Sequence, residues 1–292
     1  MGNLESITKH VVVDTTTQRT TRSCILAGIS FDTCLLVIET GHSLEVGTSL
    51  RKNIENYFKI PVKYVFLTHT HNDHRDGREA FLDSILILSN NCLGNMPKRI
   101  SLKKFDKITF DDKLVIEENN FEVEFFLTKG HSIGHSVAYF PFEKVLFGGD
   151  LFIYDSVNFG LPFMSFYQNK PKRTGNPEEY ISAYESFKKM DLDFIIPGHG
   201  DIIDKPYEVL DEYLHFFNEL KTHFKEAIND GKDYDEIEYP DLDLVKRAWE
   251  KAEKGSPPSK HKNFLKHYLE VLKTSLYNYY SGKFYEMENE DK

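Results

Sequence analysis

Apolar residues along the chain follow two periods, which divide the sequence into a strand-rich part and a helical part. From about residue 10 to 150, short runs of β-branched, aromatic and aliphatic residues alternate with polar turns, as in β-strands. We predict strands over residues 24–28, 34–39, 64–68, 84–88, 113–117, 122–128 and 136–140, with further short strands at 145–147 and 194–196. Asn119 and Asn120 are expected to form a hairpin turn, because asparagine tolerates positive φ.

The helical period dominates the later part of the chain. Asn176 and Pro177 predict a helix start, because asparagine caps a helix and proline suits its first position; we expect this helix to reach Met190. Apolar residues then fall on one face over residues 210–228, 244–252 and 264–276. We therefore predict a mixed domain over residues 1–205 and a C-terminal helical extension over residues 206–292 that packs on it.

Charge and cysteine content exclude several classes of function. A net charge of −10 disfavours nucleic acid as the main partner, because phosphate binding leaves a basic footprint. Three cysteines without a C-x-x-C pair make a disulfide framework or a thiolate cluster improbable, and they suit a reducing cytoplasm. No apolar stretch reaches the roughly 18 residues that a membrane span needs. We expect a cytoplasmic protein without a membrane span, and we leave a homodimer open.

Residues 68–77 read T-H-T-H-N-D-H-R-D-G, and residues 69–74 place three histidines and an aspartate within six positions at the end of a predicted strand. His69 and His71 can share one ion if the extended geometry continues that far, because alternate strand residues share a face. Asp73 and His74 would then face a second position. Imidazole and carboxylate groups at this spacing indicate a metal site.

Three later segments each place a candidate ligand next to glycine at a predicted strand end. They read K-G-H-S-I-G-H at 129–135, F-G-G-D at 147–150 and I-P-G-H-G at 196–200. Glycine lets the backbone turn sharply and approach an ion closely. His131, Asp150 and His199 are therefore candidate partners of the first cluster.

In order, these four segments resemble the metallo-β-lactamase superfamily, whose pattern is H-x-H-x-D-H, a G-H-[ST]-x-G loop, [TG]-G-D and a final G-H. The resemblance covers about residues 10–205 and implies that residues 1–205 are a catalytic domain. It implies an α/β (α+β) fold, an αβ/βα four-layer sandwich of two mixed β-sheets with outer helices and metals at one edge. It also implies a first metal on His69, His71 and His131, a second on Asp73, His74 and His199, and Asp150 bridging both.

Two residues beside the pattern need separate assignment. The 129–135 segment holds two histidines, and the superfamily pattern selects His131; His135 is then expected behind the ligands, and the opposite choice remains the alternative. Glu39 stands where the family usually has aspartate in I-D-T-G. It is expected to hydrogen-bond the ligand loops, with a longer side chain.

The donor set of nitrogen and oxygen suits two divalent ions, with Zn²⁺ first and Fe or Mn as alternatives. Two such ions can share a water and lower its pKa toward about 7. Asp73 or Asp150 would relay the proton, with Asp73 favoured because it binds only one metal. The aromatic residues after Asp150 either form a wall near the metals or pack against the C-terminal helices; Tyr154, Phe163 and Tyr167 are the candidate substrate-binding residues.

The leading hypothesis is a metallo-hydrolase acting on a small ester, thioester or lactone. One alternative is a mononuclear iron oxidoreductase similar to the persulfide dioxygenases. Another is a metal-dependent phosphodiesterase or nuclease, which the acidic charge disfavours. A non-catalytic binding module is the third class, and it predicts that His71→Ala would leave the biological activity intact.

Overall fold

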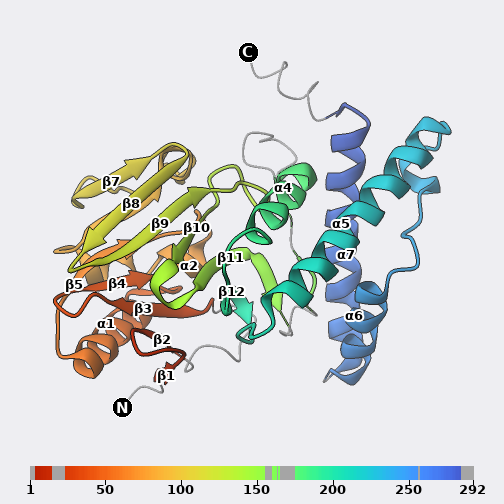
Figure 1. The fold of residues 1–292 in the computed structure, drawn as a ribbon. Helices are drawn as coiled ribbons and strands as arrows, with labels where there is room; N and C mark the ends of the chain where they lie inside the picture. The colour runs from red at the N-terminus through yellow and green to blue at the C-terminus, as the bar shows by residue number, and fades with distance from the viewer. Residues whose placement is uncertain are drawn as a thin grey trace.

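Two mixed β-sheets lie face to face, with helices outside them (Figure 1). The structure, a computed structural model, describes residues 4–14, 24–154, 160–162, 164, 175–255 and 257–283. The first sheet has the order β1-β2-β3-β4-β5-β6-β7, with β1 (Leu4–Ser6), β2 (Val11–Asp14), β3 (Leu26–Ser30), β4 (Leu35–Ile38), β5 (Val62–Phe66), β6 (Ile85–Ser89) and β7 (Lys107–Phe110). The second has the order β12-β11-β10-β9-β8, with β8 (Lys113–Glu118), β9 (Phe121–Leu127), β10 (Ser136–Phe140), β11 (Val145–Tyr154) and β12 (Phe194–Gly200).

Helices cover the outer face of each sheet. The longer helices are α1 (Leu44–Phe58), α4 (Pro177–Phe187), α5 (Pro206–Asn229), α6 (Asp243–Lys254) and α7 (Pro258–Tyr280). The short ones are α2 (Asn72–Arg75), α3 (Asn90–Gly94), η1 (Arg78–Phe81), η2 (Pro141–Glu143) and η4 (Tyr234–Glu236). The expected αβ/βα sandwich with C-terminal helices is confirmed.

Alternating strand residues build the layers. In β2, Val11 and Val13 face the core between the sheets, whereas Val12 faces the outer core, where Leu50 and Ile54 of α1 pack. Successive side chains of a strand point to opposite faces, so a strand that is buried on both sides is apolar throughout. Strands β2, β3 and β4 are buried along their whole length, so the first sheet is covered on both faces in this part.

The second sheet and the C-terminal helices share one hydrophobic cluster. It includes Leu146 of β11, Tyr184 of α4, Phe217 of α5 and Leu272 of α7. Three buried tyrosines of α4 and α5 also donate hydrogen bonds to backbone carbonyls of β11: Tyr180 to Asp150 O at 3.3 Å, Tyr184 to Leu151 O at 2.6 Å and Tyr213 to Ile153 O at 2.7 Å. The helices therefore support the strand that carries Asp150.

We expect Tyr213→Phe to lower the free energy of unfolding by about 1 kcal/mol, because it removes a buried hydrogen bond without changing the ring. Urea denaturation followed by circular dichroism would measure the change. The matched control is Tyr57→Phe on α1, where the side chain is half exposed and no change is expected. An equal loss in both variants would contradict the support that we assign to Tyr213.

Several element bounds differ from those predicted. Asn119 and Asn120 do form the β8–β9 turn, with φ of 49° and 68°. The prediction that the helix after Asn176 reaches Met190 is wrong, because α4 ends at Phe187. Past that end, the Tyr207 hydroxyl donates to Met190 O at 2.8 Å, which gives this carbonyl a partner outside a helix.

Candidate metal centre

The candidate ligands come from four segments that meet at one edge of the two sheets. Backbone hydrogen bonds join the segments there: Ser136 N donates to Thr68 O at 2.9 Å, and Ile25 N donates to Gly198 O at 2.7 Å. One ligand segment follows β5, a second links β9 to β10, and the others lie within β11 and β12. The candidate ligands, which are spread from residue 69 to residue 199, are therefore brought together at the ends of neighbouring strands.

The sequence suggested that the strand could continue through His69 and His71, but in the structure it does not. Strand β5 ends at Phe66, and the chain bends before it enters α2 at Asn72. The bend is held by side chains, because Thr68 N donates to Glu39 Oε1 at 3.2 Å and Arg75 Nε donates to Thr70 O at 2.7 Å. This loop, rather than strand alternation, directs both imidazoles to the same place.

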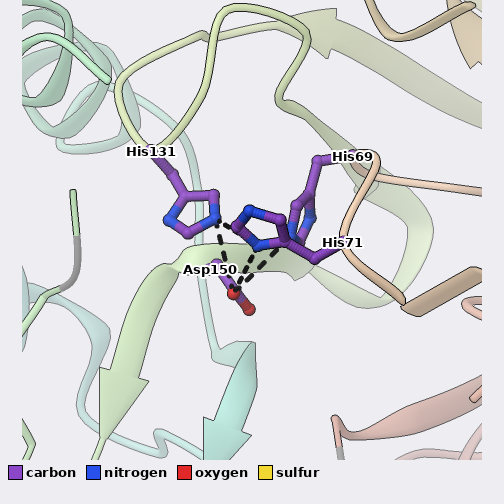
Figure 2. A group of neighbouring side chains, drawn as sticks. All are labelled: His69, His71, His131 and Asp150. Carbon is purple, nitrogen blue, oxygen red and sulfur yellow. Dashed lines mark hydrogen bonds and ion pairs between the residues drawn. The ribbon is translucent and has the colours of Figure 1, made fainter. Parts of the chain in front are cut away.

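The first group contains His69, His71, His131 and Asp150, whose ligand atoms lie within 4.8 Å of one another (Figure 2). Asp150 Oδ2 lies 3.6 Å from His69 Nε2, 4.0 Å from His71 Nδ1 and 3.5 Å from His131 Nε2. His71 is half-buried, whereas the other three are buried. A group of this kind can hold one metal ion.

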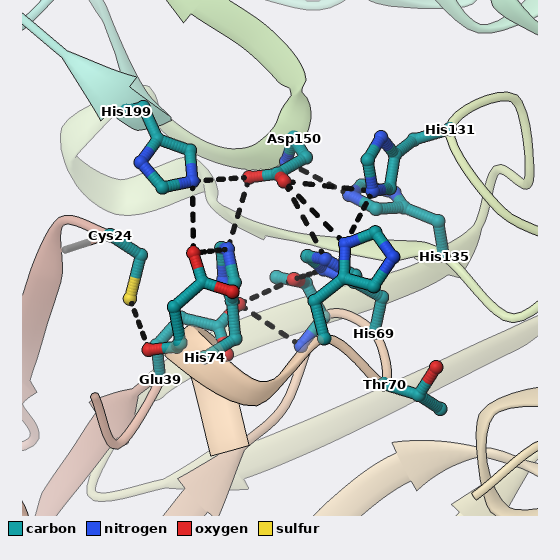
Figure 3. A network of polar contacts seen from close by, with 12 residues as sticks. Cys24, Glu39, His69, Thr70, His74, His131, His135, Asp150 and His199 are labelled. Atoms are coloured by element: carbon teal, nitrogen blue, oxygen red, sulfur yellow. Dashed lines mark hydrogen bonds and ion pairs between the residues drawn. The ribbon is translucent and has the colours of Figure 1, made fainter. Parts of the chain in front are cut away.

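The second group contains Asp73, His74 and His199. Figure 3 shows His74 and His199 on the other side of the Asp150 carboxylate from His131. Asp73 Oδ2 lies 3.5 Å from His74 Nε2 and 3.3 Å from His199 Nε2. Asp150 Oδ1 lies 3.1 Å from His74 Nε2 and 3.4 Å from His199 Nε2. Each oxygen of Asp150 therefore faces a different group.

The position of Asp150 follows from an irregularity in β11. This strand pairs in parallel with β12, but the register shifts between Phe147 and Gly149 and again between Gly149 and Ile153. Such irregularities bend a strand and redirect its side chains, and they are frequent next to active sites. Asp150 lies inside the second shift, and its side chain points to the histidines (Figure 2).

Several buried polar atoms of the site make no hydrogen bond within the protein. They include His69 Nε2, His74 Nε2 and Asp150 Oδ1. Buried polar groups are nearly always satisfied, so such a concentration indicates a missing partner. A divalent ion fits, because imidazole nitrogens and carboxylate oxygens are its usual ligands.

The electrostatics of the site favour bound cations. Burial lowers the pKa of His69 well below its usual value and, together with His131, lowers that of His71 to about 3. Burial alone would raise the pKa of Asp73, yet His74 and a hydrogen bond from His199 lower it to about 2. Neutral imidazoles and an anionic carboxylate are the forms that bind metal.

His199 shows how the site attracts positive charge. Burial alone would lower its pKa, but the negative charge of Asp150 and a hydrogen bond to Asp73 raise it. The two carboxylates thus attract positive charge at this position, which favours a bound cation.

Glu39 supports the loop that carries His69 and His74. Its buried Oε1 accepts hydrogen bonds from the Thr68 amide and hydroxyl, and lies 3.2 Å from His74 Nδ1. Thr68 Oγ1 in turn lies 2.8 Å from His69 Nδ1. Glu39 adopts a φ of 63°, in the left-handed region that few residues other than glycine occupy. Through these contacts the Glu39 side chain reaches the loop that carries His69 and His74.

His135 lies behind the first group and is fully buried. Its Nε2 is 3.1 Å from the Asp150 backbone nitrogen, and its Nδ1 is 3.1 Å from Thr128 Oγ1. His135 belongs to none of the residue groups able to hold an ion in the described chain, whereas His131 does.

The candidate substrate residues are not brought to the ligands by the described structure. Phe163 and Tyr167 lie outside the described residues. Tyr154, the last residue of β11, lines a cavity of about 280 Å³ together with Tyr213, Arg247 and Lys251. None of the described residues around this cavity is one of the seven candidate ligands.

The other described aromatic and apolar residues after Asp150 favour packing over a substrate wall. Phe152, Leu161 and Met164 are fully buried in the cluster shared with the C-terminal helices. Phe152 also stacks on Tyr213, with ring centroids 6.0 Å apart. For these three residues, the structure supports packing against the C-terminal helices and not a wall near the metals.

Sequence reasoning missed several residues that hold the ligands. The Cys24 thiol donates to Asp73 O at 3.1 Å (Figure 3), and Tyr180 donates to Asp150 O. Neither residue lies within a ligand motif, so the sequence carried no signal for them. Thr68 directly precedes His69, and its hydroxyl next to a ligand could have identified it.

No helix in the described part of the chain is both long and apolar enough to span a membrane.

Comparisons with known proteins indicate the family to which the chain is similar. The model of the metallo-beta-lactamase superfamily matches residues 75–199, which include His131, Asp150 and His199. A beta-lactamase-like protein 2 homolog of Caenorhabditis elegans is 25% identical over 183 residues, which are 62% of this chain and 56% of that protein. A hydroxyacylglutathione hydrolase of Pelagibacter ubique is 30% identical over 91 residues, which are 31% of this chain and 36% of that enzyme.

The fold has close counterparts among solved structures. A metallo-beta-lactamase from Pontibacter korlensis superimposes with a TM-score of 0.58 at 20% identity, covering 75% of this chain and 99% of that one. The chain spans about half the length of the first curated relatives that it matches. The family model and the curated relatives support the metallo-beta-lactamase superfamily, and the solved structures show the same fold.

Proposed function

We propose that this protein is a metal-dependent hydrolase with a dinuclear centre bridged by Asp150. The observation that carries the proposal is that the two oxygens of this carboxylate face different ligand groups. We assign the first position to His69, His71 and His131, and the second to Asp73, His74 and His199. Zn²⁺ suits this set of nitrogen and oxygen donors, which contains no thiolate.

Ions held by these residues would supply Lewis-acid chemistry: they would polarise a substrate oxygen and lower the pKa of a bound water toward about 7. Glu39 contacts the His74 ring and Thr68 contacts the His69 ring, so these two residues would hold the ligands in place. For the proton relay we favour Asp73 over Asp150, because the Asp73 side chain is 21% exposed and that of Asp150 only 7%. With its low pKa, Asp73 would hold a proton only briefly.

We propose a small ester, thioester or lactone as substrate. A hydroxyacylglutathione hydrolase among the relatives supports hydrolysis of a small acyl compound. We further propose that residues 1–205 form the catalytic domain and that residues 206–292 form a helical extension. Tyr154 is kept as a candidate substrate contact, since it follows Asp150 on the same strand.

Protein purified anaerobically should contain two zinc ions per chain and hydrolyse at least one compound in a panel of lactones and thioesters. Chelation should remove activity, and added Zn²⁺ should restore it. His71→Ala should lose activity by about 100-fold or more, because it removes a ligand. The control is His215→Ala on α5, an exposed histidine whose removal should change nothing.

Three outcomes would contradict the proposal. One iron per chain with oxygen uptake would indicate an oxidoreductase. Cleavage of bis(p-nitrophenyl) phosphate alone would indicate a phosphodiesterase. Full activity of His71→Ala would indicate a function that does not use the metal.

A further inference from the structure

His135 is the centre of a closed set of hydrogen bonds between the β9–β10 loop and β11. The Asp150 backbone N–H points to His135 Nε2 at 3.1 Å. On the other side of the ring, Nδ1 lies 3.1 Å from Thr128 Oγ1. The His135 carbonyl accepts from the Thr128 hydroxyl at 3.2 Å and from the amides of Thr128 and Lys129. Both ring nitrogens and the carbonyl oxygen of His135 therefore have a hydrogen-bonding partner within the protein.

These contacts define the tautomer of the imidazole. A backbone N–H can only donate, so His135 Nε2 must accept from Asp150 and carries no proton. The proton then lies on Nδ1, which donates to Thr128 Oγ1. The Thr128 hydroxyl proton remains free to point to the His135 carbonyl, as its distance allows. Thr128 therefore fixes the neutral form that accepts a hydrogen bond from Asp150.

The backbone around Asp150 depends on this acceptor. Asp150 lies inside the register shift of β11, where regular pairing with β12 is interrupted. The preceding residue, Gly149, has a φ of 50°, and a Cβ atom there would lie 2.6 Å from His135 Nε2. The chain thus passes in direct contact with the imidazole edge, and a buried N–H left without an acceptor would be costly.

We propose that His135 is a positioning residue, which orients the Asp150 carboxylate between the two ligand groups by accepting the Asp150 backbone N–H. This inference rests on the proposed metal centre and adds to it a residue that does not touch the ions. It predicts that Zn²⁺ affinity depends on the shape of the side chain at position 135 and on its ability to accept a hydrogen bond. The imidazole of His135 would not itself bind a metal ion.

Three substitutions separate these properties. His135→Gln keeps an acceptor near the position of Nε2, His135→Asn keeps a polar group only near Nδ1, and His135→Ala removes both. Exposed His215→Ala is the matched control. Zn²⁺ affinity would be measured by competition with a chromophoric chelator, and the thermal midpoint of each metal-free protein would report whether the fold survives.

We expect His135→Ala and His135→Asn to bind Zn²⁺ about 10- to 100-fold more weakly than the wild type, as for other residues that orient metal ligands. His135→Gln should recover most of that affinity. All variants should still bind the same number of ions, because none removes a ligand. The metal-free thermal midpoint of His135→Asn should lie below that of His135→Gln, because only glutamine keeps an acceptor for the buried Asp150 N–H.

Two results would overturn the inference. If His135→Gln loses one ion per chain as His135→Ala does, the ring is itself a ligand. If His135→Ala binds Zn²⁺ as tightly as His215→Ala does, the hydrogen bond to Asp150 has no role. Failure of the proposed function looks different, since the wild type would then bind no zinc pair or show no hydrolysis.

Discussion

Replacing Asp150 by asparagine should lower kcat/KM by at least about 100-fold and reduce the zinc content below two ions per chain. Asparagine has nearly the same shape, so the buried packing around position 150 is kept. It lacks the negative charge that faces His74 and His199 on one side and the first histidine group on the other. Because each oxygen of Asp150 faces a different group, one substitution should weaken both metal positions.

The measurement combines metal quantitation of the purified variant with steady-state kinetics on the best substrate of the panel. The control is Asp230→Asn at the end of α5, where the side chain is exposed and both properties should stay at wild-type values. A variant that keeps two ions and loses only activity would show that Asp150 acts on the substrate instead of bridging. Wild-type values for Asp150→Asn in both measurements would exclude the dinuclear centre as we propose it.

The sequence predicted the composition of the candidate site better than its geometry. Glycine-flanked ligands at strand ends were recognisable, because those residue types and spacings serve few other purposes. The path of the chain between Phe66 and Asn72 was not, since Glu39 and Arg75 hold that bend from separate segments. The register shift around Asp150 was equally hidden, because it depends on the pairing of β11 with a strand more than 40 residues later.

For the fold, long periodic elements were predicted well and their ends poorly. Helix α5 follows from an apolar face that continues over many turns, and this signal is local. Past the end of α4 at Phe187, the Met190 carbonyl instead accepts from the Tyr207 hydroxyl, which lies beyond β12 in the sequence. Contacts that join distant segments carry no periodicity, so a sequence pattern alone misses them.

Gly198→Ala should disrupt the site as strongly as the loss of a ligand, although it removes no polar group. A Cβ atom at position 198 would lie 2.1 Å from Asp150 Oδ1 and 2.8 Å from the carbonyl carbon of Gly149. The carboxylate can rotate away, but then it no longer faces His74 and His199. The backbone at Gly149 and Asp150 has little room to shift, because His135 Nε2 and Thr68 Oγ1 lie within 3 Å of where a Cβ atom of Gly149 would stand and the Asp150 N–H donates to His135. We therefore expect Zn²⁺ affinity to fall by about 100-fold and the metal-free protein to lose about 1–3 kcal/mol of stability.

Competition with a chromophoric chelator and urea denaturation of the metal-free protein would measure the two effects. Gly94→Ala is the matched control, because a Cβ atom at this position of α3 meets nothing within 4 Å and the helix favours alanine. If Gly198→Ala bound Zn²⁺ with wild-type affinity, the position of the Asp150 carboxylate between the two ligand groups would not be required for metal binding. The space that glycine leaves beside Asp150 is thus as much a requirement of the proposed centre as the histidines themselves, because a bridging carboxylate must reach both ions at once.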